Sequence, residues 1–478
     1  HLALIIMNSV LLIFPKHSPF PHSIAYPATI YSLGKYLEKF GYEVNYFDER
    51  IDGRQKLLNY IINKPLLVGV SAKTSYQITS ALRLVKHIRN RDNKLPIVWG
   101  GLHPTMLPEE TMKNQYVDYV IKGEGEETLK ELVDYFSGTK DIEAINGLLW
   151  KKNGQIITNK EREYLDYNEV PSPYYSVSNQ TIQKYLNKDE QIVARQPLFY
   201  FTSRGCRYAC TFCYNAYFNK NTWRPRSFTL IKEELLELKN RGISKIYFGD
   251  DNIASTNEHL EGLCDVMGEI GMTWSASIRV PTVTDAIAKK LERSNCQYLF
   301  FGIESGCEIM LNYMKKGINV AQIERCVKAV AETNIIPLYS FVFGFPYETK
   351  EHVSKSYDMV DWIREKHPKA NIQFQIYTPF PGTPMYKEAI EMGFQPPSSL
   401  EKWAKFVCDD VHVPWVKNKK ILRNMFVISI FAFRSDQFLK NIIFYIPHKL
   451  ALMRWKYKFF KFSYERLFYD LIKTKSWL

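Results

Sequence analysis

Three cysteines, Cys206, Cys210 and Cys213, lie within eight residues of each other in the spacing C-x3-C-x2-C. Thiolates are the usual protein ligands of iron–sulfur clusters. A four-iron cube needs four ligands, so three cysteines leave one iron open, and an open position on a metal lets it bind a reactant. The spacing therefore predicts a catalytic cluster at these three cysteines.

Three other uses of the cysteines fit the sequence less well. A structural zinc site requires a fourth Cys or His nearby, and buried core cysteines would not gather in one loop after a strand. A secreted disulfide framework would also spread its cysteines differently, because the first 205 residues of this chain contain none of the eight.

The cysteine loop follows the first of six apolar runs that alternate with segments of helix length. Six β/α units predict an open, partial TIM-type barrel, with functional loops at the carboxyl ends of its strands. The strands are expected near residues 198–203, 245–249, 273–277, 297–302, 338–343 and 371–377.

The N-terminal part alternates in the same way and predicts a doubly wound, Rossmann-like α/β domain. Helices are expected at residues 28–40, 75–90 and 126–136, and strands at residues 3–7, 43–47, 66–71, 96–100 and 119–121. The predicted domains are residues 1–145 (Rossmann-like), 146–195 (linker), 196–400 (partial barrel) and 401–478 (helical C-terminal region).

Composition excludes several classes of protein. With 46% hydrophobic, 14% aromatic and 24% charged residues, the 478-residue chain is not disordered, fibrous or repetitive. No run approaches the ~20 apolar residues of a membrane-spanning helix, and the first residues lack the basic flank of a signal peptide. We therefore expect a cytoplasmic protein.

The C-terminal region is strongly basic. Residues 417–478 contain fourteen Lys and Arg against three acidic residues, which accounts for +11 of the net charge of +13. Aromatic residues alternate with these cations. The preferred interpretation is a helix that packs on the barrel with its lysines reaching solvent; peripheral contact with an anionic membrane is the alternative, and no nucleic-acid-binding motif accompanies the charge.

With Phe212, the three cysteines match the C-x3-C-x-aromatic-C signature, and the sequence therefore resembles the radical S-adenosylmethionine (SAM) superfamily. The N-terminal domain resembles the cobalamin-binding domain that precedes the barrel in one class of that superfamily, and the resemblance covers roughly residues 3–400. It implies a [4Fe–4S] cluster whose open iron binds SAM, a 5′-deoxyadenosyl radical that abstracts a hydrogen, and cobalamin as a further cofactor.

The resemblance also implies SAM contacts where the barrel strands end. Glu304 is expected near the ribose of SAM, although it would also suit a salt bridge, and Asp250 and Asp251 would also suit a helix N-cap. The implied SAM-binding residues are Phe212, Gly249, Asp250, Asp251, Ser277, Arg279, Glu304, Gly344 and Tyr377.

Small residues at the strand ends of the N-terminal domain would let a large cofactor approach the backbone. The D-x-H-x-x-G motif that supplies histidine to cobalt in many cobalamin domains is absent, His103 is not assigned to cobalt, and His17 and His22 are undecided. The implied cobalamin contacts are Ser71, Gly100, Gly101, His103, Gly123, Gly125 and Glu126.

The favoured function is cobalamin-dependent radical methylation of an unactivated carbon, with a small-molecule or lipid-like substrate and an electron donor such as flavodoxin or ferredoxin. One alternative keeps the radical chemistry for cyclisation, rearrangement or dehydration and leaves the N-terminal domain vestigial or differently used. A second alternative is an iron–sulfur electron carrier or sensor, which would need neither an open iron nor a barrel.

Overall fold

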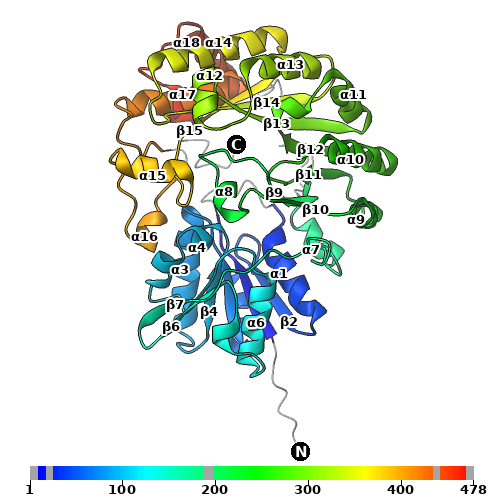
Figure 1. Ribbon diagram of the computed structural model, residues 1–478, viewed down its shortest axis with the longest axis vertical. Helices are drawn as coiled ribbons and strands as arrows, with labels where there is room; N and C mark the ends of the chain where they lie inside the picture. Colours follow the sequence, from blue (N-terminus) through cyan, green and yellow to red (C-terminus); the bar gives the residue numbers. More distant parts are fainter. Residues whose placement is uncertain (1–8, 18–24, 187–196, 408–409, 434–441, 470–478) are drawn as a thin grey trace, which may run out of the picture. The chain divides into compact units, whose positions relative to one another are not determined.

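The computed structural model describes residues 9–17, 25–186, 197–407, 410–433 and 442–469. The chain forms two compact units (Figure 1). The first comprises residues 1–190 and 396–407, and the second comprises residues 191–395 and 408–478.

The first unit contains a seven-stranded sheet in the order β2-β1-β3-β4-β5-β6-β7. Strands β1 to β5 are parallel, and β6 and β7 are antiparallel. The interior strand β1 is an uninterrupted run, SVLLIF, that is buried throughout, as a parallel strand covered on both faces requires. The strands are β1 (Ser9–Phe14), β2 (Glu43–Asp48), β3 (Leu67–Ser71), β4 (Ile97–Gly100), β5 (Tyr119–Ile121), β6 (Leu148–Lys152) and β7 (Gln155–Thr158).

Helices cover both faces of this sheet. Helices α1 and α6 contact each other on one face, and α3 and α4 lie on the other (Figure 1). The strand order reverses between β1 and β3, and in doubly wound sheets such a point carries the ligand site. The helices are α1 (Ala28–Lys39), α2 (Arg54–Ile62), α3 (Tyr76–Arg89), α4 (Leu102–Met106), α5 (Pro108–Met112), α6 (Glu126–Phe136), the 3-10 helix η1 (Ile142–Ala144), α7 (Asn179–Gln183) and α16 (Leu400–Trp403).

The second unit is built on six parallel strands in the order β15-β14-β13-β12-β11-β8. The two edge strands, β8 and β15, do not pair with each other, so the sheet is an open barrel. A small antiparallel pair, β9 and β10, follows the first strand. The strands are β8 (Leu198–Tyr200), β9 (Ser203–Gly205), β10 (Trp223–Pro225), β11 (Lys245–Phe248), β12 (Thr273–Ile278), β13 (Cys296–Glu304), β14 (Ile336–Phe343) and β15 (Asn371–Ile376).

Hydroxyl and amide side chains fix where the outer helices of this barrel begin. Ser227, Thr256, Thr284, Asn319 and Thr349 each accept a hydrogen bond from the first turn of the helix that follows. The helices are α8 (Asn215–Phe218), α9 (Phe228–Asn240), α10 (Asn257–Ile270), the 3-10 helix η2 (Val280–Thr282), α11 (Asp285–Arg293), α12 (Glu308–Tyr313), α13 (Val320–Ala331), α14 (Lys350–Lys366) and α15 (Pro384–Glu391).

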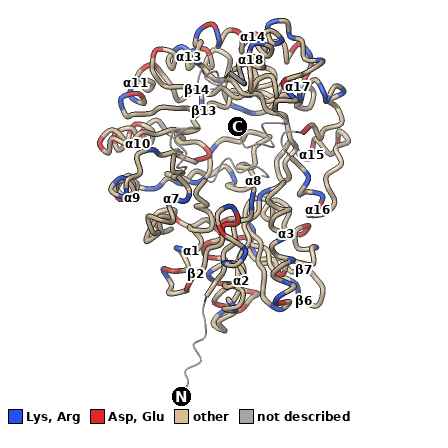
Figure 2. The backbone as a smooth tube through the Cα atoms, turned by 180° about the vertical axis from the view of Figure 1, so that it is seen from behind, with Lys and Arg blue, Asp and Glu red and all other residues tan. Residues whose placement is uncertain are grey.

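Two helices close the described part of the chain, α17 (Lys419–Ala432) and α18 (Ile442–Lys456). Helix α17 packs on β15 and on α18. Within the described residues, no helix is long and apolar enough to cross a membrane. Over most of both units, Lys and Arg are interspersed with Asp and Glu (Figure 2).

The α/β fold class, with a Rossmann-like domain, a six-unit parallel barrel sheet and a helical C-terminal region, is as predicted. The predicted strand at residues 3–7 lies outside the described residues, whereas β1 and α2 were not predicted. Residues 148–158, predicted as part of a linker, instead extend the first sheet as β6 and β7. Residues 396–407, predicted to lie across the end of the barrel and the C-terminal region, belong to the first unit.

Candidate active site

The cysteine loop begins where β9 ends. Gly205 has φ +84°, and a Cβ there would overlap the carbonyl oxygen of Thr222, so only glycine fits before Cys206. The N–H of Cys213 donates to the carbonyl of Cys210 (3.1 Å), and the N–H of Thr211 donates to Met314 (3.0 Å). These bonds hold the loop against the segment after α12.

The three thiols share one partly buried environment. Burial, followed by the neighbouring Cys210 and Cys206, raises the pKa of Cys213 to about 12. Burial also raises the pKa of Cys206, and the positive charge of Arg279 opposes this. Because a raised pKa keeps the free thiols of Cys206 and Cys213 protonated, a bound metal is what would make them thiolates.

The donor set fits a cube with one open iron. Within the described ranges, no three His, Cys, Asp or Glu side chains converge as a site for one metal ion. Three cysteines of a cube need not do so, because each thiolate binds a different iron.

Arg279, at the end of β12, faces the cysteine loop. Its Nη1 lies 3.6 Å from Sγ of Cys210, and its guanidinium lies 3.7 Å from the ring centroid of Tyr208. A second nitrogen, Nη2, donates to the carbonyl of Lys316. Arg279 therefore places a buried positive charge beside the thiols and joins their loop to the segment at Lys316.

Asp250, at the end of β11, holds the start of the cysteine loop. Its carboxylate accepts from the Thr202 hydroxyl (2.9 Å) and N–H (3.2 Å) and from the Ser203 hydroxyl (2.6 Å). Burial raises its pKa to about 6 despite these bonds. Asp250 is neither a helix cap nor an open contact, and Thr202 and Ser203, which sequence reasoning did not single out, directly precede the loop.

Asp251 contacts the other end of the cysteine loop from Asp250. Its carboxylate accepts a hydrogen bond from the phenol of Tyr214, one residue after Cys213, and the Asn219 amide lies 3.4 Å away. The neighbouring Asn252 is buried and donates to Ala254 (2.8 Å). The loop after β11 thus braces the cysteine loop at both of its ends.

Glu304 forms a buried ion pair with Lys316, at 2.9 Å. Glu304 has φ +68°, a strained value for a non-glycine residue, and Gly302 leaves the space that the two side chains occupy. The Lys316 ammonium also lies 5.9 Å from the ring centroid of Phe212. Lys316 was missed from the sequence, because only the fold brings it next to the strand that carries Glu304.

The remaining predicted SAM residues have structural partners. The Ser277 hydroxyl lies 3.2 Å from that of Tyr247. Gly249 packs against Phe201. Tyr377 is buried, its phenol donates to Met385 (3.3 Å), and its ring lies 4.9 Å from that of Phe345.

The loop after β14 contains a half-buried residue, Glu348, whose carboxylate accepts a backbone hydrogen bond. Gly344, at φ +91°, donates its N–H to Glu348 (2.6 Å), and its carbonyl accepts from the Trp415 indole (3.0 Å). Burial raises the pKa of Glu348 to about 7. Phe345 in the same loop contacts the ring of Phe212, at 5.6 Å. Phe212, Arg279, Glu304 and Gly344 therefore belong to one connected set of contacts around the cysteine loop.

In the first unit, small residues line the carboxyl edge of the sheet. The N–H of Ala72 donates to the carbonyl of Gly100 (2.9 Å), which ties the ends of β3 and β4 together. Gly101 has φ +96°, and a Cβ there would lie 2.9 Å from the oxygen of Ala72 and 3.3 Å from the hydroxyl of Ser71. Gly123, at φ +88°, donates its N–H to Thr105 (3.0 Å), and Gly125 begins α6.

The predicted contacts His103 and Glu126 point inward. His103 is fully buried, its Nδ1 lies 3.0 Å from the Thr74 hydroxyl, and its ring lies 5.7 Å from that of Trp403. Burial lowers the pKa of His103 to about 4, so its ring is neutral. Glu126 is buried and accepts from Ser32 (2.8 Å). His17, after β1, lies 6.1 Å from the ring of Phe14, and His22 lies outside the described residues.

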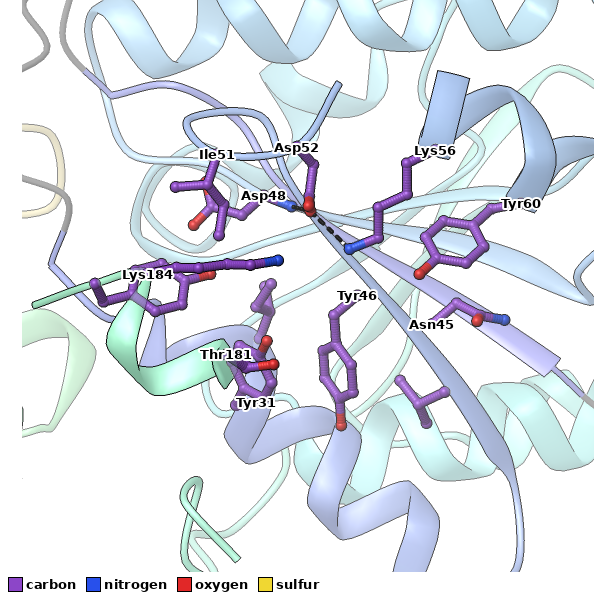
Figure 3. Close-up of a pocket in the computed structure, with 13 residues that line it drawn as sticks. Tyr31, Asn45, Tyr46, Asp48, Ile51, Asp52, Lys56, Tyr60, Thr181 and Lys184 are labelled. Carbon is purple, nitrogen blue, oxygen red and sulfur yellow. Dashed lines mark hydrogen bonds and ion pairs between the residues drawn. The ribbon is translucent and has the colours of Figure 1, made fainter. Parts of the chain in front are cut away.

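A separate cavity of about 170 Å³ lies at the β2 edge of the first unit, between α1, α2 and α7. Its lining includes Lys56, which lies 2.9 Å from Asp52 (Figure 3), and Asp48, which pairs with Arg50 at 2.6 Å. No residue predicted to bind SAM or cobalamin lines it, so it lies apart from the candidate cofactor sites.

A parallel open barrel with a three-cysteine loop at the end of its first strand defines an iron–sulfur enzyme that works on a bound cosubstrate. Residues 200–360 match the model of the radical SAM superfamily, and residues 22–133 match that of the B12 binding domain. An uncharacterized methyltransferase of Pyrococcus horikoshii is 33% identical over 353 residues, which is 71% of this chain and 74% of the relative. The chain belongs to the radical SAM superfamily, in the group that also carries a B12-binding domain.

Two other similarities cover nearly the whole chain. The anaerobic magnesium-protoporphyrin IX monomethyl ester cyclase of Cereibacter sphaeroides is 23% identical over 94% of this chain and 74% of its own. The solved structure of the cobalamin-dependent SAM radical enzyme OxsB matches 98% of this chain and 75% of its own, with 18% identity and a TM-score of 0.72. The predicted cofactors, a [4Fe–4S] cluster, SAM and cobalamin, are confirmed by the family.

Proposed function

We propose that the chain is a cobalamin-dependent radical SAM methyltransferase that acts on an unactivated carbon of a small molecule. The observation that carries the proposal is the combination, in one chain, of a three-cysteine loop and a B12-binding domain, with a 33% identical relative named as a methyltransferase. An unactivated carbon cannot attack SAM as a nucleophile. Hydrogen abstraction solves this problem, because it creates a reactive centre first.

In this proposal, Cys206, Cys210 and Cys213 hold the cluster, which supplies the electron that splits SAM. Arg279 stabilises the thiolates through its buried charge, and Asp250 is a positioning residue that fixes the loop through Thr202 and Ser203. These assignments rest on the hydrogen bonds and contacts that Arg279 and Asp250 make with the cysteine loop and its start.

The buried pair of Glu304 and Lys316 offers SAM two complementary groups. A lysine ammonium donates to a carboxylate, and a glutamate accepts from ribose hydroxyls. The pair lies near the cysteine loop, since the Lys316 ammonium is 5.9 Å from the ring centroid of Phe212. We assign the SAM carboxylate to Lys316 and the ribose to Glu304. Gly249, Ser277, Gly344 and Tyr377 then shape the walls of the site, and Asp251 braces the cysteine loop.

We propose that cobalamin, the methyl carrier when bound, lies over the carboxyl edge of the first sheet, where Ser71, Gly100, Gly101, Gly123 and Gly125 leave the backbone accessible. The reversal of strand order between β1 and β3 supports this place. We do not retain His103 and Glu126 as contacts, because both are buried beneath other side chains.

The proposed enzyme works in a reducing compartment, the cytoplasm, with flavodoxin or ferredoxin as its electron donor. The described cysteines are free, which fits such a compartment.

The test is anaerobic reconstitution with iron, sulfide and hydroxocobalamin, followed by incubation with SAM and a reductant. We expect near-stoichiometric cobalt by elemental analysis, 5′-deoxyadenosine from radical cleavage, and S-adenosylhomocysteine that forms only when cobalamin is bound. Loaded protein that yields 5′-deoxyadenosine but no S-adenosylhomocysteine would contradict methyl transfer.

A second candidate is a radical SAM enzyme that does not methylate, such as a cyclase. The cyclase of Cereibacter sphaeroides, similar over 94% of this chain, favours it. Product mass separates the two, since methylation adds a methylene and cyclisation does not. An electron carrier, the third possibility, would cleave no SAM.

A further inference from the structure

Within the last described segment, residues 445–467 expose an unusual number of large apolar side chains. Its eight such residues are 44% to 70% exposed, and only nine others occur in the rest of the described chain. We call this segment, with its exposed lysines, the C-terminal face. Its members are Tyr445, Ile446, Lys449, Met453, Lys456, Tyr457, Phe459, Lys461, Phe462, Tyr464 and Leu467.

Helix α18 directs its exposed side chains to one side. At about 100° per residue, the positions of Tyr445, Ile446, Lys449, Met453 and Lys456 fall within an arc of about 100°. Tyr457, directly after the helix, continues this side. The exposed positions of α18 therefore form one continuous strip rather than a scatter of single exposed residues, which would need no explanation.

Contacts within the second unit fix which side of α18 is inside. The Trp455 indole donates to Asp361 (2.6 Å), and its ring packs at 5.0 Å on that of Phe433. His448 contacts the carbonyl of Phe431 at 2.8 Å, and Ala451 is fully buried. The inner side of α18 is thus covered by the rest of the second unit, whereas its exposed outer side is also apolar. A helix that is apolar on both sides is normally covered on both.

The charge on this face has one sign. Lys449, Lys456 and Lys461 are exposed. Among the described residues 442–469, the single carboxylate is Glu465, which is buried and lies 3.5 Å from Arg454. Lys458 pairs with Asp361 on α14. The partner of this face must therefore accept apolar and aromatic side chains and carry negative charge.

We propose that the C-terminal face binds the surface of a bilayer that contains anionic phospholipid. Lysines that reach the headgroups while aromatic and aliphatic side chains enter the boundary region are the pattern of interfacial helices. A second copy of the chain would bring lysines against lysines, which is unfavourable. The phosphate backbone of a nucleic acid would leave Ile446, Met453 and Leu467 uncovered. The inference goes beyond the proposed function and does not depend on methyl transfer.

The experiment is vesicle flotation with the full chain, reconstituted with iron, sulfide and hydroxocobalamin. Vesicles consist of phosphatidylcholine alone or of phosphatidylcholine mixed with phosphatidylglycerol. We expect at least about tenfold more protein to float with the anionic vesicles, and the difference to shrink as salt is added.

Two sets of variants test the two components of the face. Ile446→Ser with Met453→Ser and Tyr457→Ser removes apolar contacts, and Lys449→Glu with Lys456→Glu and Lys461→Glu reverses the charge. Each set should lower flotation at least about tenfold. These residues touch no group of the cysteine loop, so radical SAM cleavage should be unchanged, which also shows that the variants fold.

Matched controls come from exposed residues elsewhere. Phe40→Ser with Ile62→Ser and Tyr175→Ser removes equally exposed apolar side chains from the first unit, and Lys64→Glu with Lys289→Glu and Lys369→Glu makes the same change of charge. Both control proteins should float like the parent chain. Equal flotation with neutral vesicles, an equal loss in the controls, or loss of a dimer in light scattering with no effect on flotation would each overturn the proposal.

Discussion

At the scale of single residues, buried charge decides the chemistry around the cysteine loop. Arg279 places a buried positive charge beside the thiol of Cys210, and Glu304 compensates the buried ammonium of Lys316. Charges of this kind are destabilising alone and tolerable only in pairs. The pairs can therefore be tested by removing one member and then both.

Lys316→Met leaves the Glu304 carboxylate buried without its partner. We expect the free energy of unfolding to fall by about 3–5 kcal/mol, measured by thermal or denaturant unfolding. Adding Glu304→Gln should restore most of that stability but not the affinity for SAM, measured from the SAM dependence of 5′-deoxyadenosine formation. Lys355→Met, which breaks an exposed pair on α14, is the control and should change neither quantity appreciably. Normal SAM affinity in the double variant would mean that the pair is structural only.

Glu348 should make stability depend on pH. Its pKa in the folded chain, about 7, exceeds its ordinary value of 4.5, so folding takes up a proton between these values. The contribution of Glu348 to the free energy of unfolding is then fully present below pH 4.5. It is lost as pH rises toward 7, by about 1–3 kcal/mol. Glu348→Gln does not titrate. The difference in melting temperature between parent and variant should therefore shift in favour of the variant from pH 5 to pH 8. Glu351→Gln, at an exposed site, should show no such shift.

At the scale of elements, the sequence predicts the strands whose carboxyl ends carry candidate functional residues. All six barrel runs and four strands of the first sheet were predicted within a few residues of their bounds, because parallel strands buried on both faces read as continuous apolar runs. Two features were not predictable. The apolar run that forms β1 adjoins an equally apolar stretch at residues 3–7, and α16 packs on α3 although about 300 residues separate them.

The residues of the candidate site also divide into those that the sequence could predict and those that it could not. The cysteine loop, Arg279 and Glu304 could be named from their places after strands. Lys316 and the bonds of Asp250 to Thr202 and Ser203 could not, since each joins two loops that only the closed sheet brings together. His103 was misleading for a related reason. A polar residue after Gly-Gly marks a turn, and α16, which buries it, lies far along the chain.

Gly101 tests whether the edge of the first sheet needs a close backbone approach. Its φ of +96° and its closeness to the Ala72 oxygen forbid a side chain. Gly101→Ala should lower the free energy of unfolding by about 1–3 kcal/mol and reduce bound cobalt, measured by elemental analysis. Gly53→Ala, at a site with open space and an extended backbone, is the control and should retain cobalt. Full cobalt binding by Gly101→Ala would move the cofactor away from this edge.

At the scale of the whole molecule, the chain separates two cofactor functions into two units. The cysteines lie in the second unit, and the glycine-lined edge lies in the first, each with its own core. Methyl transfer needs both, whereas radical cleavage of SAM needs only the cluster. The two functions should therefore be separable by substitution.

Replacing Cys206, Cys210 and Cys213 together by Ala should remove the iron and abolish 5′-deoxyadenosine formation, because no thiolate remains to hold a cluster. Cobalt binding should persist at the level of the parent chain, since none of the three side chains belongs to the first unit. Iron and cobalt are measured by elemental analysis on the same reconstituted sample.

The control replaces three buried cysteines outside the loop, Cys264, Cys296 and Cys326, by Ala. If this control variant stays folded, it should keep iron, cobalt and SAM cleavage. Loss of cobalt together with iron from a folded triple variant of the loop would contradict this prediction. It would show that the B12-binding domain binds its ligand only when the cluster is present, so that the two units do not bind their cofactors independently.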